Sequence, residues 1–102
     1  MVLKHAFSTI INAEKIGRNV TIYQQVTVGN SGKGCPSIGN DVQISCGAIV
    51  LGPISIGDDV IIGAGAVVVK DIPSHSIVVG NPARIIKRRN GFNDVWKTVN
   101  DA

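Results

Sequence analysis

The chain has 102 residues, enough for one domain, and its net charge of +3 at pH 7 would suit an anionic ligand. Hydrophobic residues make up 44% of the chain but aromatic residues only 4%, so a core must be built from Val, Ile and Ala. No apolar run approaches the roughly 18 residues that a membrane span requires, and we expect no membrane partner.

From Ile16 onwards, apolar residues recur every six positions. This spacing matches neither a helix, which repeats about every 3.6 residues, nor a strand, which repeats about every 2. The first positions of the blocks are Ile16, Ile22, Val28, Ile38, Ile44, Val50, Ile56, Ile62 and Val68, and the fifth positions are Val20, Val26, Val42, Ala48, Ile54, Val60, Ala66 and Ile72. All seventeen are apolar.

Hexapeptide repeats are typical of a parallel β-helix, in which three short strands and three corners form one coil of about 18 residues. The first residue of each block then points inward, and the fifth fills the space near a corner. Such a coil winds left-handed, against the usual preference of parallel crossovers. Glycine takes the second place in several blocks, where a corner needs either a positive φ or room for the next coil. We predict an all-β protein, with a left-handed parallel β-helix over residues 1–87.

The repeat is interrupted between Val28 and Ile38 by "VGNSGKGCPSIG", which holds four residues beyond the regular six. Gly, Ser and Pro dominate this stretch, so a loop is expected to leave the column at a corner. The insertion is either a simple bulge or a functional loop, since loops on a rigid scaffold commonly carry function.

After Pro73 the repeat ends, and "SHSIVVGNPARIIKRR" predicts a loop and a last strand. Residues 88–102 are predicted to be a basic segment followed by a short capping helix, with Phe92, Val95, Trp96 and Val99 on one face. A cap at the open end would cover unpaired backbone groups. The run "RIIKRR" holds four of the ten basic residues, but no DNA- or RNA-binding motif accompanies it, so we expect no nucleic-acid partner.

The two cysteines and the residues after Met1 indicate where in the cell the protein is expected. No charged and apolar leader follows Met1, so we expect no secretory signal. Cys35 and Cys46 make a poor disulfide framework and are expected to be reduced thiols. Together these features predict a cytoplasmic protein.

Two long segments carry a resemblance to a known family. "IGDDVIIGAGAVVVKDIPSHSIVVGNPARIIK" resembles the C-terminal signature of the hexapeptide-repeat acyltransferases, and "EKIGRNVTIYQQVTVGNSGKGCPSIGNDV" is similar to the central part of the serine acetyltransferase branch. The resemblance runs over residues 3–87. It implies a homotrimer of left-handed β-helices with active sites between subunits. It also implies direct transfer of acetyl from acetyl-CoA to a hydroxyl or an amine, with a histidine as general base and no metal.

A hydroxyl is too weakly acidic to attack a thioester unaided, so a base must accept its proton. Imidazole, with an ordinary pKa of about 6.5, suits this task at neutral pH. The chain has two histidines, His5 and His75. The resemblance favours His5, in "LKHAFSTIIN", as the catalytic base, because His75 falls in a turn of variable sequence.

The resemblance also assigns binding residues. The residues implied for CoA are Cys46 and Ala64 along the pantetheine arm, Val69 and Lys70 beside the pyrophosphate, and Arg84 and Lys87 at the phosphates. Arg and Lys suit those phosphates by charge. The residues implied for the substrate loop are Asn30, Lys33 and Cys35.

The acceptor stays open between serine and a sugar hydroxyl. Cys35 stands where the serine enzymes have a histidine, and Lys4 stands where they have an aspartate, so both departures favour a sugar or polysaccharide precursor, modified on oxygen or nitrogen. The "TIYQQVTVG" match favours serine. A metal-dependent lyase of the γ-carbonic-anhydrase type would need three imidazoles around zinc, which two histidines per chain make a poor fit. A structural β-helix without chemistry is the remaining alternative.

Overall fold

The computed structural model describes residues 2–3 and 9–99, and within them the regular structure is entirely β-strand. The strands are β1 (Val2–Leu3), β2 (Ile10–Ile11), β3 (Lys15–Ile16), β4 (Thr21–Ile22), β5 (Thr27–Gly29), β6 (Ser37–Ile38), β7 (Gln43–Ile44), β8 (Ile49–Leu51), β9 (Ser55–Ile56), β10 (Val60–Ile62), β11 (Val67–Val68), β12 (Ser76–Val79), β13 (Arg84–Arg88) and β14 (Lys97–Thr98). This part of the chain contains no helix long and apolar enough to cross a membrane.

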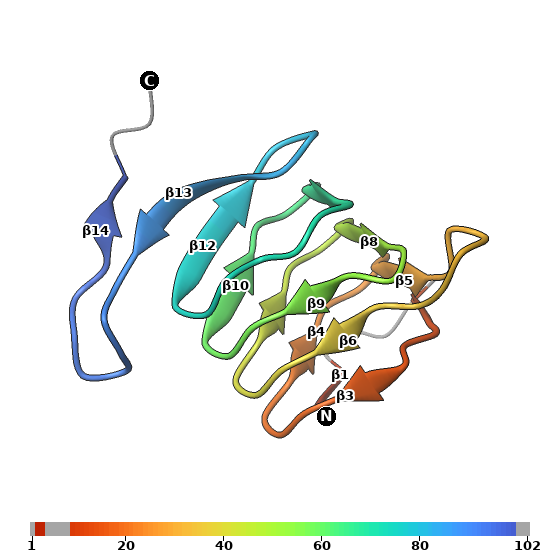
Figure 1. Ribbon diagram of the computed structural model, residues 1–102, viewed down its shortest axis with the longest axis horizontal. Coiled ribbons are helices and arrows are strands. Elements are labelled where there is room, and N and C mark those ends of the chain that lie inside the picture. Colours follow the sequence, from red (N-terminus) through yellow and green to blue (C-terminus); the bar gives the residue numbers. More distant parts are fainter. Residues whose placement is uncertain (1, 4–8, 100–102) are drawn as a thin grey trace.

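The strands stack into three sheets, one for each side of a coiled column (Figure 1). In the described residues their orders are β1-β4-β7-β10-β12-β13-β14, β2-β5-β8-β11 and β3-β6-β9. Pairing is parallel up to β12, and Gln43 lies beside Ile61, eighteen residues later. This step equals three six-residue blocks. The predicted fold class, a left-handed parallel β-helix, is therefore confirmed.

The core consists of the predicted first and fifth positions. Except for Ile16, which is half-buried at the first coil, every predicted inward residue is at most 8% exposed. Val78, on β12, continues this core beyond the repeat. Because the inward side chains are aliphatic and stacked one coil above another, the core is a narrow column of Val and Ile. Full burial of each such side chain contributes about 1.5–3 kcal/mol.

Most second-place glycines are required by close approach between coils, not by a positive φ; Gly29 is the exception, since a Cβ there would only touch Leu51 at 3.5 Å. A Cβ at Gly39 would lie 2.7 Å from the carbonyl oxygen of Gly57 in the next coil. Outside glycine, most positive φ angles occur at polar residues that stack at one corner of the column, including Asp41 (58°), Asp59 (55°) and His75 (60°). Short polar side chains tolerate this left-handed conformation better than aliphatic ones do.

The inserted residues form the predicted projecting loop between β5 and β6 (Figure 1). The pairing of Thr27 with Ile49 spans twenty-two residues, which is one coil plus the four inserted residues. Asn30 holds the loop from within, because its Oδ1 accepts hydrogen bonds from the backbone N–H groups of Gly32 (2.6 Å) and Gly34 (3.2 Å).

The C-terminal segment corrects two predictions. The single last strand is in fact two, β12 and β13, which pair antiparallel, and the predicted capping helix is replaced by β14, which pairs antiparallel with β13. Val95 is 70% exposed and Phe92 is 56% exposed, so these residues do not form a buried helix face. The added strands cover the edge of β12 by backbone pairing, which satisfies the exposed groups that the helix was expected to cover.

Candidate functional site

A small cavity opens beside β11, the last strand of its four-stranded sheet. Its volume is about 110 Å³, and its lining residues are Val67, Val68, Val69, Lys70, Ile72, Pro82 and Ala83. The turn between β12 and β13 closes over β11 through two backbone hydrogen bonds. The N–H of Val67 donates to the carbonyl of Gly80 and the N–H of Ala83 donates to the carbonyl of Val67, both at 2.9 Å. The turn therefore forms one wall of the cavity and β11 forms another.

Three predicted CoA residues lie at or beside this cavity. Val69 and Lys70 line it, and Arg84 begins β13 directly after the lining residue Ala83. Val69 is 49% exposed, and the side chains of Lys70 and Arg84 are also exposed. The cavity thus has an apolar wall, and solvent-exposed cationic side chains lie at its edge. Lys87 lies farther along β13, opposite Ile77, and is not among the lining residues.

The other two predicted CoA residues lie on consecutive turns. The N–H of Gly65, next to Ala64, donates to the carbonyl of Cys46 at 2.9 Å, so the two turns stack directly. Cys46 and Ala64 are both exposed. A Cβ at Gly65 would meet nothing within 4 Å, which leaves open space along this corner. Ala64 precedes the cavity residue Val67 by three positions, so small exposed residues lead along the chain to the cavity.

The remaining predicted residues are not brought to the cavity. Asn30, Lys33 and Cys35 lie in the projecting loop, where Lys33 is exposed and Cys35 is half-buried. They are absent from the cavity lining. His5 lies outside the described residues. Among residues 2–3 and 9–99, no group of three or more His, Cys, Asp or Glu side chains gathers in a metal-binding arrangement.

A second polar cluster centres on Asp59, which is only 3% exposed. Arg89 holds this carboxylate through both oxygens, with Nη2 2.6 Å from Oδ1 and Nε 2.8 Å from Oδ2. The Nδ1 of His75 lies 2.8 Å from the same Oδ2. The guanidinium of Arg89 also lies over the rings of Trp96 (4.1 Å to the centroid) and Phe92 (5.2 Å). These contacts fasten the C-terminal hairpin to the column.

The electrostatics of this cluster favour an ionised Asp59. Burial acts to raise the pKa of Asp59, but hydrogen bonds from Arg89 and His75 outweigh it and hold the pKa below its ordinary value. The hydrogen bond with Asp59 raises the pKa of Arg89. The sequence did not reveal this cluster, because Asp59 and Arg89 are thirty residues apart and no motif links the two.

Comparisons with known proteins identify the repeat. The model of the family "Bacterial transferase hexapeptide (six repeats)" matches residues 35–70. A probable serine acetyltransferase 5 from Oryza sativa subsp. japonica is 47% identical over an alignment of 96 positions, and the match covers 89% of this chain and 28% of that protein. The serine acetyltransferase of Staphylococcus xylosus is 45% identical over an alignment of 93 positions, and the match covers 86% of this chain and 43% of that protein.

Solved structures agree with these relatives. The Neisseria gonorrhoeae serine acetyltransferase superposes with a TM-score of 0.81 at 40% identity, covering 85% of this chain and 35% of that one. A serine acetyltransferase in complex with CoA gives a TM-score of 0.78 at 34% identity, covering 83% of this chain and 36% of that one. The chain spans less than half the length of these relatives. It carries bacterial transferase hexapeptide repeats, and its homologues and structural neighbours are serine acetyltransferases.

Proposed function

We propose that this chain is an acetyl-CoA-dependent O-acetyltransferase of the serine acetyltransferase kind. The observation that carries the proposal is the 45% identity to the Staphylococcus xylosus enzyme over 86% of this chain. A match over 86% of the chain is long enough to include the coils, the projecting loop and the β12–β13 turn that forms one wall of the cavity. The similarity therefore extends beyond the hexapeptide repeat.

The cavity beside β11 supports the cofactor assignment. Acetyl-CoA joins a slender pantetheine arm to a pyrophosphate and a 3′-phosphate. The open corner at Cys46 and Ala64 has room for the arm, and the apolar wall at Val69 excludes water from its methylene groups. Lys70 and Arg84 are exposed cations at the cavity's end, and Lys87 extends this charge along β13. Charge-assisted hydrogen bonds from such groups suit phosphate oxygens.

In the proposed reaction His5 is the general base. The acceptor hydroxyl gives its proton to His5 as its oxygen attacks the thioester carbonyl. The carbon–sulfur bond then breaks, the acetyl group stays on the acceptor, and the departing CoA thiolate takes the proton from His5. Backbone N–H groups would stabilise the oxyanion that forms between these steps. His75 is a poorer choice of base, because it lies in the separate cluster with Asp59 and Arg89 and does not line the cavity beside β11.

Serine is the first acceptor we propose, since the relatives compared above are serine acetyltransferases. A sugar hydroxyl is the second candidate. Cys35, at the base of the projecting loop, takes the place of a histidine expected for the serine enzymes, and Lys4 takes the place of an aspartate. Both changes remove groups suited to an amino-acid acceptor.

The test is a screen of acetyl-CoA consumption against serine and a panel of sugars, with release of the CoA thiol as the signal. Serine-dependent release supports the first acceptor, and release with a sugar supports the second. A ligand held only by the native state must raise the melting temperature. Failure of all acceptors, together with no rise in melting temperature on adding CoA, would leave only a structural role.

The outer face of one sheet supports a homotrimer as part of the proposal. Ile10, Thr27, Ile49 and Val67 are in register across β2, β5, β8 and β11, and Ile10 is 63% exposed. Burying this ladder against a second copy would remove apolar area from water. Sedimentation equilibrium at micromolar concentration should give three times the chain mass, and a monomer would contradict the trimer. We also propose a cytoplasmic location, supported by the unpaired state of Cys35 and Cys46.

A further inference from the structure

Two basic side chains stand directly opposite each other on the C-terminal hairpin. Arg88 on β13 pairs in the antiparallel register with Lys97 on β14. Side chains opposite each other in such a ladder have Cβ atoms about 5 Å apart, and like charges at these positions destabilise the pairing. The register therefore places two positive charges where a negative group between them would stabilise the hairpin.

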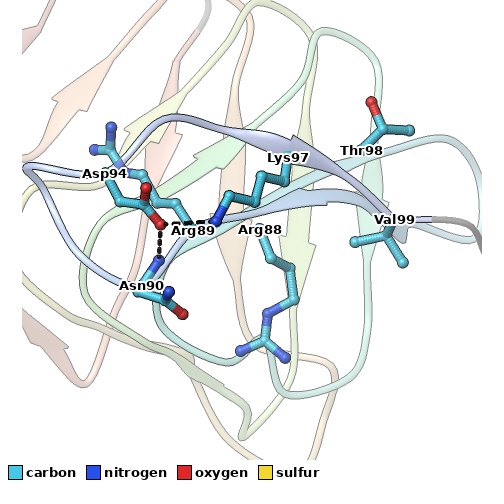
Figure 2. A pocket seen from close by; sticks show the side chains of 7 residues that line it. All are labelled: Arg88, Arg89, Asn90, Asp94, Lys97, Thr98 and Val99. Carbon is cyan, nitrogen blue, oxygen red and sulfur yellow. Dashed lines mark hydrogen bonds and ion pairs between the residues drawn. The ribbon is translucent and has the colours of Figure 1, made fainter.

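Within the described residues, the charges around the pair leave one positive charge uncompensated. Lys97 Nζ lies 3.5 Å from Asp94 Oδ2, and Figure 2 shows the two side chains turned toward each other. Backbone hydrogen bonds from Asn90 and Val95 hold the pKa of Asp94 below its ordinary value, so this carboxylate is ionised and offsets one cation.

Arg88 has no comparable partner within residues 9–99. Its Nη2 donates to the carbonyl of Ser74 at 3.5 Å, a long hydrogen bond to a neutral acceptor. Figure 2 shows its guanidinium pointing away from Lys97 and Asp94. The third cation of this region, Arg89, is already neutralised by Asp59. The uncompensated charge thus belongs to Arg88.

A surface pocket of about 380 Å³ adjoins these groups. Its lining residues are Arg88, Arg89, Asn90, Asp94, Lys97, Thr98 and Val99. Asn90 adds a neutral hydrogen-bond donor to the two cations. The frame is rigid, because Asp59 holds Arg89 through both oxygens and Arg89 stacks on Trp96. The hollow combines the size, donors and charge that a small oxyanion requires.

We propose that this pocket binds a phosphate group, held by Arg88 and Lys97, whose side chains lie on the same face of the hairpin. A tetrahedral oxyanion offers enough acceptors to engage the Arg88 fork and the Lys97 ammonium at once. The site goes beyond acetyl transfer, because none of its lining residues belongs to the cavity beside β11. It does not depend on the proposed function.

The test uses Trp96, which is the single tryptophan of the chain and stacks on a residue that lines the pocket. Its fluorescence is followed while inorganic phosphate is added, with sodium chloride at equal ionic strength as the reference, because salt alone screens the Arg88–Lys97 repulsion. We expect a saturable change with phosphate and none with chloride.

The variants Arg88→Gln and Lys97→Gln should each weaken phosphate binding about tenfold, as expected for the loss of one charge-assisted hydrogen bond. Lys15→Gln, which removes an exposed lysine on β3, is the matched control and should bind phosphate as the unmodified chain does. In sodium chloride without phosphate, the melting temperature of Arg88→Gln should be no lower than that of the unmodified chain, because the substitution relieves a like-charge pair. An unchanged melting temperature then shows that weaker phosphate binding is not caused by loss of folding.

Repeating the titration with saturating CoA assigns the source of the phosphate. Unchanged affinity means that a separate phosphorylated ligand or free phosphate uses the pocket, and competition means that CoA supplies the group; both results support the phosphate site. An equal response to chloride would overturn the proposal. So would an undiminished phosphate affinity in both the Arg88→Gln and Lys97→Gln variants.

Discussion

Arg89, on the C-terminal hairpin, binds both carboxylate oxygens of Asp59, which lies thirty residues earlier at the corner of the column just before β10. The carboxylate is 3% exposed and also lies 2.8 Å from His75 Nδ1. The hairpin is therefore attached to the column by a buried ion pair in addition to the backbone pairing of β12 with β13.

Asp59→Asn is expected to destabilise the protein by about 3 kcal/mol, because removing one partner of a buried ion pair leaves the other charge uncompensated. Urea unfolding followed by Trp96 fluorescence measures the effect close to the hairpin. Asp58→Asn is the matched control. Asp58 is exposed and accepts the N–H of Asn40, which an asparagine oxygen also accepts, so a change within about 0.5 kcal/mol is expected. Equal losses in the two variants would contradict the role of the pair.

The pH dependence of stability should follow the ionisation of Asp59. Its pKa in the folded state lies below the ordinary value of 3.8, so its contribution is fully present above that value and is lost as the pH falls through the lower folded value. The difference in unfolding free energy between the unmodified chain and Asp59→Asn should stay constant from pH 7 to about pH 4 and shrink below it. Denaturant titrations at stepped pH check this, and a gap that widens on acidification would refute it.

Gly39→Ala should cost about 1–3 kcal/mol, the usual penalty for forcing extra volume into a packed region. The added Cβ would lie 2.7 Å from the carbonyl oxygen of Gly57, and that oxygen belongs to the backbone of the next coil. Gly91→Ala is the control, because a Cβ there would meet nothing within 4 Å. Thermal melts of the two variants should differ clearly. Similar melting temperatures would show that the coils separate easily.

Arg84→Gln should raise the KM for acetyl-CoA about tenfold while leaving kcat unchanged, since it removes a contact made equally in the ground state and the transition state. Arg18→Gln removes another exposed arginine, on the β3–β4 turn away from the cavity, and should leave both constants unaltered. Steady-state kinetics with the acceptor held at saturation provide the measurement. A fall in kcat at constant KM would place Arg84 outside cofactor binding.

His5→Asn should lower kcat by about 10²–10⁴, the range that general base catalysis contributes. Binding of CoA should persist, seen as an undiminished rise in melting temperature with the ligand. His75→Asn is the control for the second histidine; it weakens the contact with Asp59 and should reduce stability more than turnover. Normal turnover in His5→Asn would remove this residue from the mechanism.

The amino-acid sequence by itself determined the column. An inward residue such as Ile44 and a corner residue such as Val60 recur at a constant step, and a step of six has no match in a helix or a flat strand. Because each coil packs on the one before it, the local period also sets the register, as the pairing of Gln43 with Ile61 shows. The same regularity exposed the loop after Val28 as an insertion.

Only the tertiary structure decided the C-terminal segment and the cluster that holds it. The spacing of Phe92, Val95 and Trp96 fits a helix face, yet Arg89 draws the aromatic rings of Phe92 and Trp96 onto its guanidinium, and β14 pairs with β13. In the sequence, Asp59 is one of several acidic residues in the repeats, and only the structure shows that its carboxylate is buried against Arg89 of the hairpin. Periodic order passes from one coil to its neighbour and is visible in the chain, whereas an ion pair between distant segments exists only once the backbone has brought them together.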